Sequence, residues 1–297
     1  MSPNNRAAGH GAPHRGARAR LIRRWLPRAV LFLALATMTA GCSSNWVNNL
    51  GLRNPLTSQA DLIVHLWQGS WIAAICVGLV VWGAILWAVI FYRKRGDTIP
   101  HQVRYNLPIE ILYTVVPFIM VGVLFYFTAR DENKITALSS KCDRPSCLIV
   151  DVTGFQWSWE FQYPQYAAKN SANGVTEVGY MWDPDKSSAV DYSELPLLEV
   201  PEHETVRFNL TSDDVIHSFW VLPFDFKRDV LPDHPNHFQV YPTHVLYTGY
   251  DTIGRCSELC GLYHSRMLFR IKIVTPTQFK AWITAQQKLQ NASGGAQ

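Results

Sequence analysis

Two long stretches without a charged residue constrain this chain more than any other feature of its sequence. Residues 62–92 contain no Asp, Glu, Lys or Arg, and residues 111–129 form a second uncharged run. At about 1.5 Å per residue, each run is long enough to cross a hydrocarbon core about 30 Å thick. A buried helix of a soluble protein rarely runs past about 14 residues without a polar face. We therefore predict transmembrane helices at residues 71–92 and 109–129.

The connection between these spans, residues 93–108, carries four basic residues: Arg93, Lys94, Arg95 and Arg104. Loops rich in Lys and Arg stay on the cytoplasmic side of a membrane, so we predict that this loop is cytoplasmic. Residues 42–70, and everything from residue 130 onward, then lie on the extracellular or periplasmic side. This arrangement predicts a multi-pass protein of the plasma membrane.

Glu110 stands at the cytoplasmic end of the second predicted span. One interpretation is an interfacial carboxylate in contact with water. The other is a group at which protons enter, because ionisable residues at the edges of spans often mark proton paths. The position of Glu110 alone leaves both interpretations open.

The first 41 residues have the pattern of an export signal. Residues 1–28 hold seven Arg and no acidic residue, and an apolar run at 29–40 follows that is too short to span a bilayer. Small residues then precede Cys42, as in bacterial lipoprotein signals, which are cut before a lipid-bearing cysteine. We predict a signal peptide at residues 1–41 and lipidation of Cys42. An ordinary signal anchor with an incidental cysteine is the alternative.

The charge of the chain is unevenly distributed. The whole chain holds 27 Lys and Arg against 23 Asp and Glu, but without residues 1–28 the balance becomes 20 against 23, or −3. Residues 130–297 hold 15 basic and 20 acidic residues. This balance argues against a nucleic-acid partner, which needs a dense basic face. An acidic external domain suits a cationic redox partner, although simple solvation of a loop explains the same charge.

After residue 130 the pattern changes to short alternating runs separated by Pro, Gly, Asn and Asp. Residues 148–152, 206–210 and 269–273 alternate in this way and predict strands. Many short strands predict an all-β sandwich or barrel, which we assign to residues 130–275.

Three further features belong to the external part of the chain. Residues 167–196 are polar and acidic and predict a long inserted loop, and residues 276–297 predict a C-terminal helix and tail. Cys142 and Cys147 are close in sequence with turn-forming residues between them. A disulfide between them is one interpretation in an oxidising compartment, and two free thiols are the other.

The residues that indicate a chemical role lie mainly in one short segment. It reads Cys256-Ser-Glu258-Leu-Cys260-Gly-Leu-Tyr-His264-Ser-Arg-Met267, and His217 lies about forty residues earlier. Two thiols, two imidazoles and a thioether form a soft ligand set that suits copper better than Mg, Ca or Mn.

The second cysteine of this segment predicts two metal ions rather than one. A single blue-copper site uses one Cys, two His and a long axial Met. Here two sulfur atoms could bridge two copper ions, each with one His as its terminal ligand, while Met267 and the main-chain carbonyl of Glu258 serve as weak axial ligands. Zinc also accepts Cys and His, but a structural zinc site does not need Met267. A disulfide between Cys256 and Cys260 is the other alternative.

Three motifs together resemble subunit II of bacterial cytochrome c oxidases of the haem–copper type, over about residues 46–275. The copper segment is the first. The others are Gly154-Phe-Gln-Trp157-Ser-Trp159-Glu-Phe161 and Glu110-Ile-Leu-Tyr-Thr114-Val-Val-Pro117. The resemblance implies two spans and an outward-facing cupredoxin domain, which is a Greek-key sandwich. It also implies that electrons from cytochrome c pass through the copper centre to haem in subunit I, where oxygen is reduced and protons are pumped.

The same resemblance assigns roles to individual residues. The copper ligands would be His217, Cys256, Glu258 through its carbonyl, Cys260, His264 and Met267. The Glu258 carboxylate would bind a magnesium ion shared with subunit I, Trp157 would be the electron entry point, and Glu110 would open a proton path. The haems would belong to subunit I only, and subunits I and III and membrane lipid would be partners.

The insertion at residues 167–196 and a lipid on Cys42 suggest an actinobacterial branch of this family. Some such oxidases join a cytochrome bc complex that carries its own haem c. The electron donor would then be either a soluble cytochrome c or that haem c subunit.

Other protein families share some of these sequence features. A membrane-anchored copper chaperone for oxidase assembly also uses two cysteines separated by three residues, but its His lies far downstream in an α/β pattern. A quinol oxidase subunit keeps the fold and lacks the copper ligands, and nitrous oxide reductase lacks the paired spans. The copper chaperone is the main alternative.

Overall fold

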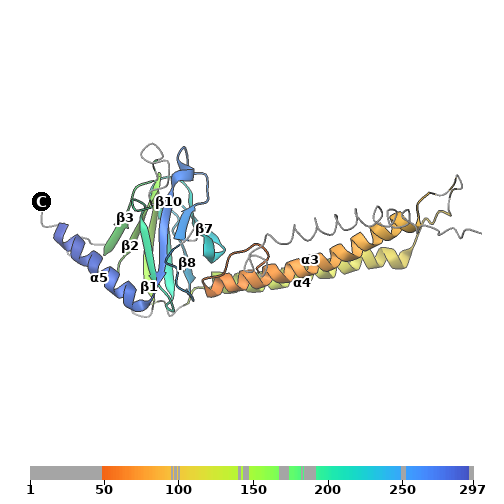
Figure 1. Cartoon of the computed structure of the whole chain (residues 1–297), viewed down its shortest axis with the longest axis horizontal. Coiled ribbons are helices and arrows are strands. Elements are labelled where there is room, and N and C mark those ends of the chain that lie inside the picture. The colour runs from red at the N-terminus through yellow and green to blue at the C-terminus, as the bar shows by residue number, and fades with distance from the viewer. Residues whose placement is uncertain are drawn as a thin grey trace, which may run out of the picture. The chain divides into compact units, whose positions relative to one another are not determined.

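The computed structural model of this chain describes residues 49–94, 96, 99, 101–139, 142, 147–166, 174–181, 183, 192–248 and 252–293. The predicted signal segment and Cys42 lie outside these residues, as do Arg95 and about half of the predicted insertion. The described part contains two long helices, a β domain and a C-terminal helix (Figure 1).

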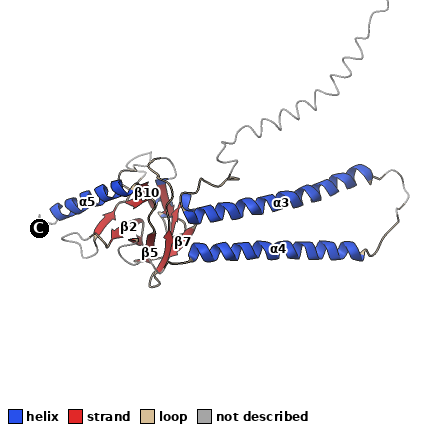
Figure 2. Ribbon diagram, turned by 90° about the horizontal axis from the view of Figure 1, so that it is seen from below, coloured by secondary structure: helices blue, strands red, loops and turns tan. Residues whose placement is uncertain are grey.

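The two long helices are α3, Ser58–Phe91, and α4, Leu107–Thr136. They run side by side (Figure 2), and both are long and apolar enough to cross a membrane. Ala60 and Val64 are the only buried residues of α3, and Asp131 is the only one of α4. Large apolar side chains therefore cover the outside of both helices, a surface that suits lipid and not water.

Both helices extend beyond the spans predicted from the sequence. Helix α3 has 34 residues and is about 50 Å long, which exceeds a hydrocarbon core of about 30 Å. Its first turn is capped by Thr57, whose hydroxyl accepts a hydrogen bond from the Ala60 N–H. The segment predicted as external, residues 42–70, thus contains the first turns of α3, because a helix does not have to end where the hydrocarbon ends.

The β domain is a sandwich of two five-stranded sheets. Their strand orders are β3-β2-β1-β5-β8 and β4-β10-β9-β6-β7. Strand β1 is parallel to β5 and β4 is parallel to β10, while the other neighbours are antiparallel. The strands are β1 Leu148–Phe155, β2 Ser158–Tyr163, β3 Val175–Val178, β4 Leu197–Pro201, β5 Val206–Ser212, β6 His217–Val221, β7 Lys227–Val230, β8 Asn236–Val240, β9 Ile253–Cys256 and β10 Leu268–Val274.

Aromatic rings fill the space between the two sheets. Phe219 and Phe269, both from the second sheet, are stacked with their centroids 4.9 Å apart. Phe161 of the first sheet meets the edge of Phe269 at 5.3 Å. Trp159, also fully buried, packs against both Phe219 and His217. The core therefore reaches directly beneath His217 and fixes the position of its ring.

The predicted strands lie within β1, β5 and β10. The range predicted as an inserted loop, residues 167–196, contains the short edge strand β3, which pairs with β2. The four residues of β3, Val175-Thr-Glu-Val178, do not alternate and are too few to predict a strand, so the pairing with β2 decides their conformation.

The C-terminal helix α5, Pro276–Ser293, lies against the open side of the sandwich. The side-chain amide of Gln290 donates to the carbonyl of Thr176 in β3 and accepts from its N–H. At the facing edge, the Tyr163 hydroxyl donates to the carbonyl of Glu199 in β4 and accepts from its N–H. These contacts satisfy the backbone groups of Thr176 and Glu199 on two edge strands, where unpaired groups could otherwise pair with another chain.

Candidate metal centre

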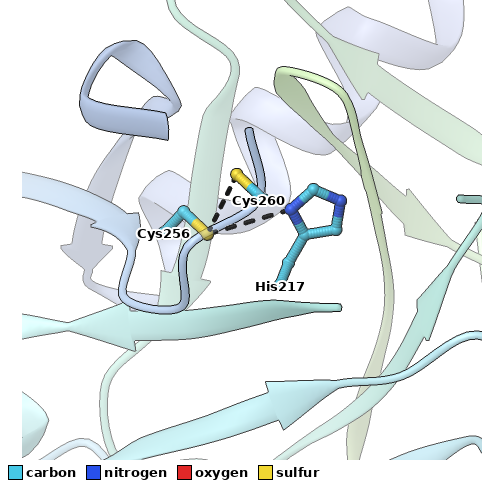
Figure 3. Close-up of side chains that lie close together, drawn as sticks. All are labelled: His217, Cys256 and Cys260. Atoms are coloured by element: carbon cyan, nitrogen blue, oxygen red, sulfur yellow. Dashed lines mark hydrogen bonds between the residues drawn. The ribbon is translucent and has the colours of Figure 1, made fainter. Parts of the chain in front are cut away.

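Strand pairing brings the predicted metal ligands together from distant positions. His217 begins β6 and Cys256 ends β9, and these strands pair with Phe219 opposite Cys256. The loop after β9 carries Cys260 and leads into a short 3-10 helix, His264–Arg266, before β10. The side chains of His217, Cys256 and Cys260 point toward one another (Figure 3).

The six predicted ligand groups are the two sulfur atoms of Cys256 and Cys260 and four further donors that lie beside them. The Cys256 Sγ lies 3.8 Å from His217 Nδ1 and 3.2 Å from the carbonyl oxygen of Glu258. The Cys260 Sγ lies 3.5 Å from His264 Nδ1 and 3.8 Å from the Met267 Sδ. Each sulfur atom therefore has its own imidazole and its own weak donor, an arrangement with two equivalent halves.

This donor set fits copper. The sulfur atoms of Cys256 and Cys260 are 3.8 Å apart, well beyond the roughly 2.05 Å of a disulfide. Both cysteines are free, so the alternative of a disulfide between them is wrong. His217 and Met267 are fully buried, and the two cysteines are exposed by 5% or less. Two thiols, two imidazoles and a thioether are soft donors, which suit copper, and they exceed the four ligands of a structural zinc site; of these five side chains only His264 is partly exposed.

Asp214 holds the ring of His217 from its far side. Its Oδ1 lies 2.8 Å from His217 Nε2, which leaves Nδ1 directed toward Cys256. Such outer partners orient a metal-binding imidazole and select its tautomer. Burial acts to raise the pKa of Asp214, but hydrogen bonds from the Gln156 N–H and from His217 lower it overall. Burial acts to lower the pKa of His217, and its hydrogen bonds with Cys256 and Asp214 raise it overall.

The two thiols differ in acidity. Burial acts to raise the pKa of Cys256, but hydrogen bonds with His217 and with neighbouring backbone groups lower it overall. Burial, followed by the negative charge of Cys256, raises the pKa of Cys260 to about 12. Because metal ligands must be deprotonated, binding of a metal at this pair releases protons.

Trp157 is attached to the same cluster. Its indole Nε1 donates to the carbonyl oxygen of Cys260 at 3.1 Å, and its ring meets the edge of Tyr263 at a centroid distance of 4.8 Å. The side chain is half-buried. The residue predicted as the electron entry point is therefore one hydrogen bond away from a residue predicted to bind metal.

The structure places the remaining predicted residues as follows. Glu258 is exposed, with its carbonyl oxygen beside Cys256. Glu110 lies in the first turn of α4, where its carboxylate accepts a hydrogen bond from the Asn106 N–H, so it also serves as a helix cap. Cys142 and Cys147 are joined by a disulfide.

Two residues of the centre were missed in the sequence. Asp214 precedes His217 by three residues, and Gln156 lies inside the aromatic segment, yet neither position has a spacing that marks an outer partner of a metal ligand. Their roles depend on loop conformation. Gln156 donates from its side chain to Cys260 and from its N–H to Asp214.

Comparison with known proteins shows the family to which this chain is similar. Residues 148–274 match the family described as "Cytochrome C oxidase subunit II, periplasmic domain". The chain is 43% identical over 302 residues to "Probable cytochrome c oxidase subunit 2" of Streptomyces avermitilis, which covers 94% of this chain and 90% of that relative. It is 34% identical over 328 residues to "Cytochrome c oxidase subunit 2" of Mycobacterium bovis, which covers 95% of this chain and 85% of that relative.

Among solved structures, the chain is similar to the periplasmic domain of subunit II of cytochrome oxidase of Bradyrhizobium japonicum. The identity is 27% and the TM-score 0.38, over 48% of this chain and 94% of that one.

The family match and the Streptomyces and Mycobacterium relatives confirm the resemblance, and the two apolar helices followed by the β sandwich confirm the predicted fold class. The two apolar helices and the periplasmic-domain family indicate a membrane-anchored protein with an extracellular domain. The family carries the copper A centre, for which His217, Cys256 and Cys260 form a suitable cluster. This chain belongs to the cytochrome c oxidase subunit II family and is a subunit of a haem–copper oxidase complex.

Proposed function

We propose that this chain accepts electrons from cytochrome c at a dinuclear copper A centre and passes them to haem in subunit I of a proton-pumping oxidase. One observation carries the proposal: four donor groups, from His217 and from residues 258–267, lie around the two buried cysteine sulfur atoms, and each sulfur lies beside a different imidazole. The residues that would hold the two copper ions are His217, Cys256, Glu258 through its carbonyl, Cys260, His264 and Met267. Bound there, copper supplies a one-electron carrier.

The chain's own residues prepare the site for that role. Burial of His217 and Met267 keeps water away from these two donors, and Asp214 holds the imidazole of His217 in a fixed orientation. A rigid, dry site changes little between oxidation states, which favours fast electron transfer. A copper chaperone must release its metal, and ligands this deeply buried support retention instead.

Trp157 is the proposed entry point for electrons. Its hydrogen bond to the Cys260 carbonyl provides a short route from the domain surface to the ligand loop. Leu259 and Leu262, next to Cys260, are both 79% exposed and would form an apolar contact for the donor. The net negative charge of the external residues supports a cationic donor, either soluble cytochrome c or the haem c subunit of a bc complex. Reduction by a permanently attached haem c subunit would depend little on ionic strength.

Metal stoichiometry tests the central proposal. The full chain in detergent is loaded with copper and its EPR spectrum recorded, with two copper ions per chain and a mixed-valence signal expected. Cys260→Ser should abolish this signal, whereas Cys76→Ser, an exposed cysteine of α3, should leave it unchanged. A four-line spectrum with one copper per chain would contradict the dinuclear centre.

The Glu258 carboxylate is proposed to bind a magnesium ion shared with subunit I. Its exposure and the inward position of its carbonyl support separate roles for side chain and main chain. In the assembled oxidase, Glu258→Gln should keep the copper spectrum and weaken binding of Mn²⁺ substituted for magnesium. Unchanged Mn²⁺ binding would remove this role.

Glu110 is proposed to stand at the entrance of a proton path into subunit I. Its place at the end of α4 supports this role, although its hydrogen bond with Asn106 is sufficient to explain a helix cap. Glu110→Gln keeps an acceptor for that bond and removes the proton, so it separates the two roles. Slower oxygen consumption by the assembled oxidase is expected, and an unchanged rate would leave only the cap.

The topology and processing of the chain complete the proposal. Residues 1–41 would be removed, Cys42 would carry lipid, and the loop at residues 93–108 would face the cytoplasm. Mass spectrometry of the mature N-terminus tests the first two points, and an unmodified Cys42 would contradict the lipoprotein assignment.

A further inference from the structure

We propose that Gln156 is a positioning residue that holds Trp157 and both ligand-bearing segments in one hydrogen-bonded unit. The inference rests on the proposed function, because it concerns the same metal centre. Gln156 contacts no ligand atom itself. It acts through the carbonyl of Cys260 and the carboxylate of Asp214.

Gln156 reaches both halves of the centre through two different groups. Its side-chain Nε2 donates to the Cys260 carbonyl oxygen at 2.8 Å. Its backbone N–H donates to Asp214 Oδ2 at 2.7 Å, and the other oxygen of Asp214 lies 2.8 Å from His217 Nε2. One residue therefore connects the loop that carries Cys260 to the carboxylate that orients His217.

The Cys260 carbonyl is the point where this unit closes. It accepts from Gln156 Nε2 and from Trp157 Nε1, and two donors use both lone pairs of a carbonyl oxygen. The next residue is Gly261, with φ +120°, a conformation that favours glycine. A Cβ at this position would lie 3.1 Å from Gln156 Nε2 and 3.2 Å from Trp157 Nε1. The glycine thus allows the loop to approach both donors closely.

The role of Gln156 is separable from the stability of the domain. Gln156 is exposed, so when its side chain is removed, water can donate to the Cys260 carbonyl in place of the lost amide. Its substitution should leave the sandwich folded and loosen the ligand loop. Loss of an outer partner of a metal ligand lowers metal affinity about 10- to 100-fold. Because Gln156 acts through one further group, we expect the lower end of that range, about tenfold.

Two substitutions separate hydrogen bonding from shape. Gln156→Ala removes the donor, whereas Gln156→Glu keeps the size and turns a carboxylate oxygen toward the Cys260 carbonyl. Gln165→Ala is the matched control, because the Gln165 amide also donates to a cysteine carbonyl, that of Cys147, at the opposite end of β1. All variants are made in the full chain in detergent. The readouts are copper retention against a chelator, the EPR spectrum and the reduction potential.

We expect both Gln156 variants to lose copper about tenfold more readily than the wild-type chain, with Gln156→Glu at least as affected as Gln156→Ala. Their EPR spectra and potentials should shift, while the unfolding midpoint of the metal-free chain stays unchanged. Gln165→Ala should retain copper normally.

Wild-type retention, spectrum and potential in both Gln156 variants would overturn the inference, and so would an equal loss of copper in Gln165→Ala. A wild-type chain that takes up no copper pair would instead overturn the proposed function. The two failures are therefore distinguishable.

Discussion

The helix pair exposes its large apolar side chains, whereas the β domain buries them. In α4, Phe118 is 83% exposed and Phe125 72%, while in the β domain Phe161, Phe208 and Phe269 are all fully buried. The single buried residue of α4 is the acid Asp131. The helices thus depend on lipid or on a neighbouring subunit to cover their side chains, whereas the β domain covers its own.

This difference teaches which part of the protein organises the metal centre. All six predicted ligands come from the part with a self-contained core, in which strand register places each side chain. A site that must keep its geometry through electron transfer is best placed on such rigid elements. The helices supply length and apolar surface, and their side chains need little precision.

The largest effect should come from a matched pair of Phe→Ala substitutions. Phe219 is 1% exposed between the two sheets, so Phe219→Ala should lower the free energy of unfolding of the β domain by about 3–5 kcal/mol. Phe125→Ala, on the outer surface of α4, should leave that transition unchanged. Unfolding of the full chain in detergent, followed by near-UV circular dichroism, measures both. Equal losses would show that the two regions share one core.

A matched pair of charge insertions tests the other side of the comparison. Val80 is 73% exposed on α3, and Val80→Lys should oppose membrane insertion by about 3 kcal/mol. Val178 is 58% exposed on β3, and Val178→Lys should change stability by no more than about 0.5 kcal/mol. The membrane-integrated fraction after expression measures the first effect. Normal integration of Val80→Lys would contradict a membrane span at this position.

The stability of the β domain should depend on external pH. Burial, opposed in part by Arg270, raises the pKa of Glu177 to about 7. Burial also raises the pKa of Glu199 to about 7, opposed in part by Lys272. The folded domain therefore keeps protons that the unfolded chain, with carboxyl pKa values near 4.5, has already lost.

Stability should consequently be highest below about pH 4.5 and fall as pH rises to about 7, by about 1–3 kcal/mol. Glu199→Gln should reduce this fall, because one of the two titrating groups is gone. Unfolding midpoints at about pH 5 and about pH 8 measure the difference. An identical pH dependence in wild type and variant would exclude Glu199 as a source.

The smallest effect should come from the contact between α5 and the edge of β3. Gln290→Ala removes both hydrogen bonds to Thr176 and should cost about 1 kcal/mol. Lys288→Ala, an exposed position of the same helix, is the control. Hydrogen exchange of the Thr176 amide should accelerate in the first variant only. Unchanged exchange would show that α5 does not protect this edge.

The sequence allowed much of this fold and site to be predicted. The absence of charge revealed two spans, and alternation revealed strands β1, β5 and β10. Residue type and spacing predicted a soft donor set from Cys256 to Met267, and the structure brings these side chains together. The short strand β3 was expected to be loop, because pairing with β2, and not local pattern, gives it its conformation.

Residue types and their spacing thus determined by themselves that the chain carries two membrane helices, an all-β domain and a soft ligand set. Only the tertiary structure decided that Cys256 and Cys260 lie beside different imidazoles. It also decided that Asp214 orients His217 and that Gln156 connects Asp214 to the Cys260 carbonyl. The physical reason is the distance along the sequence over which each property acts. Periodicity and ligand chemistry are local properties of the chain, whereas these contacts depend on the pairing of β6 with β9 and on loop conformations that the packed core fixes.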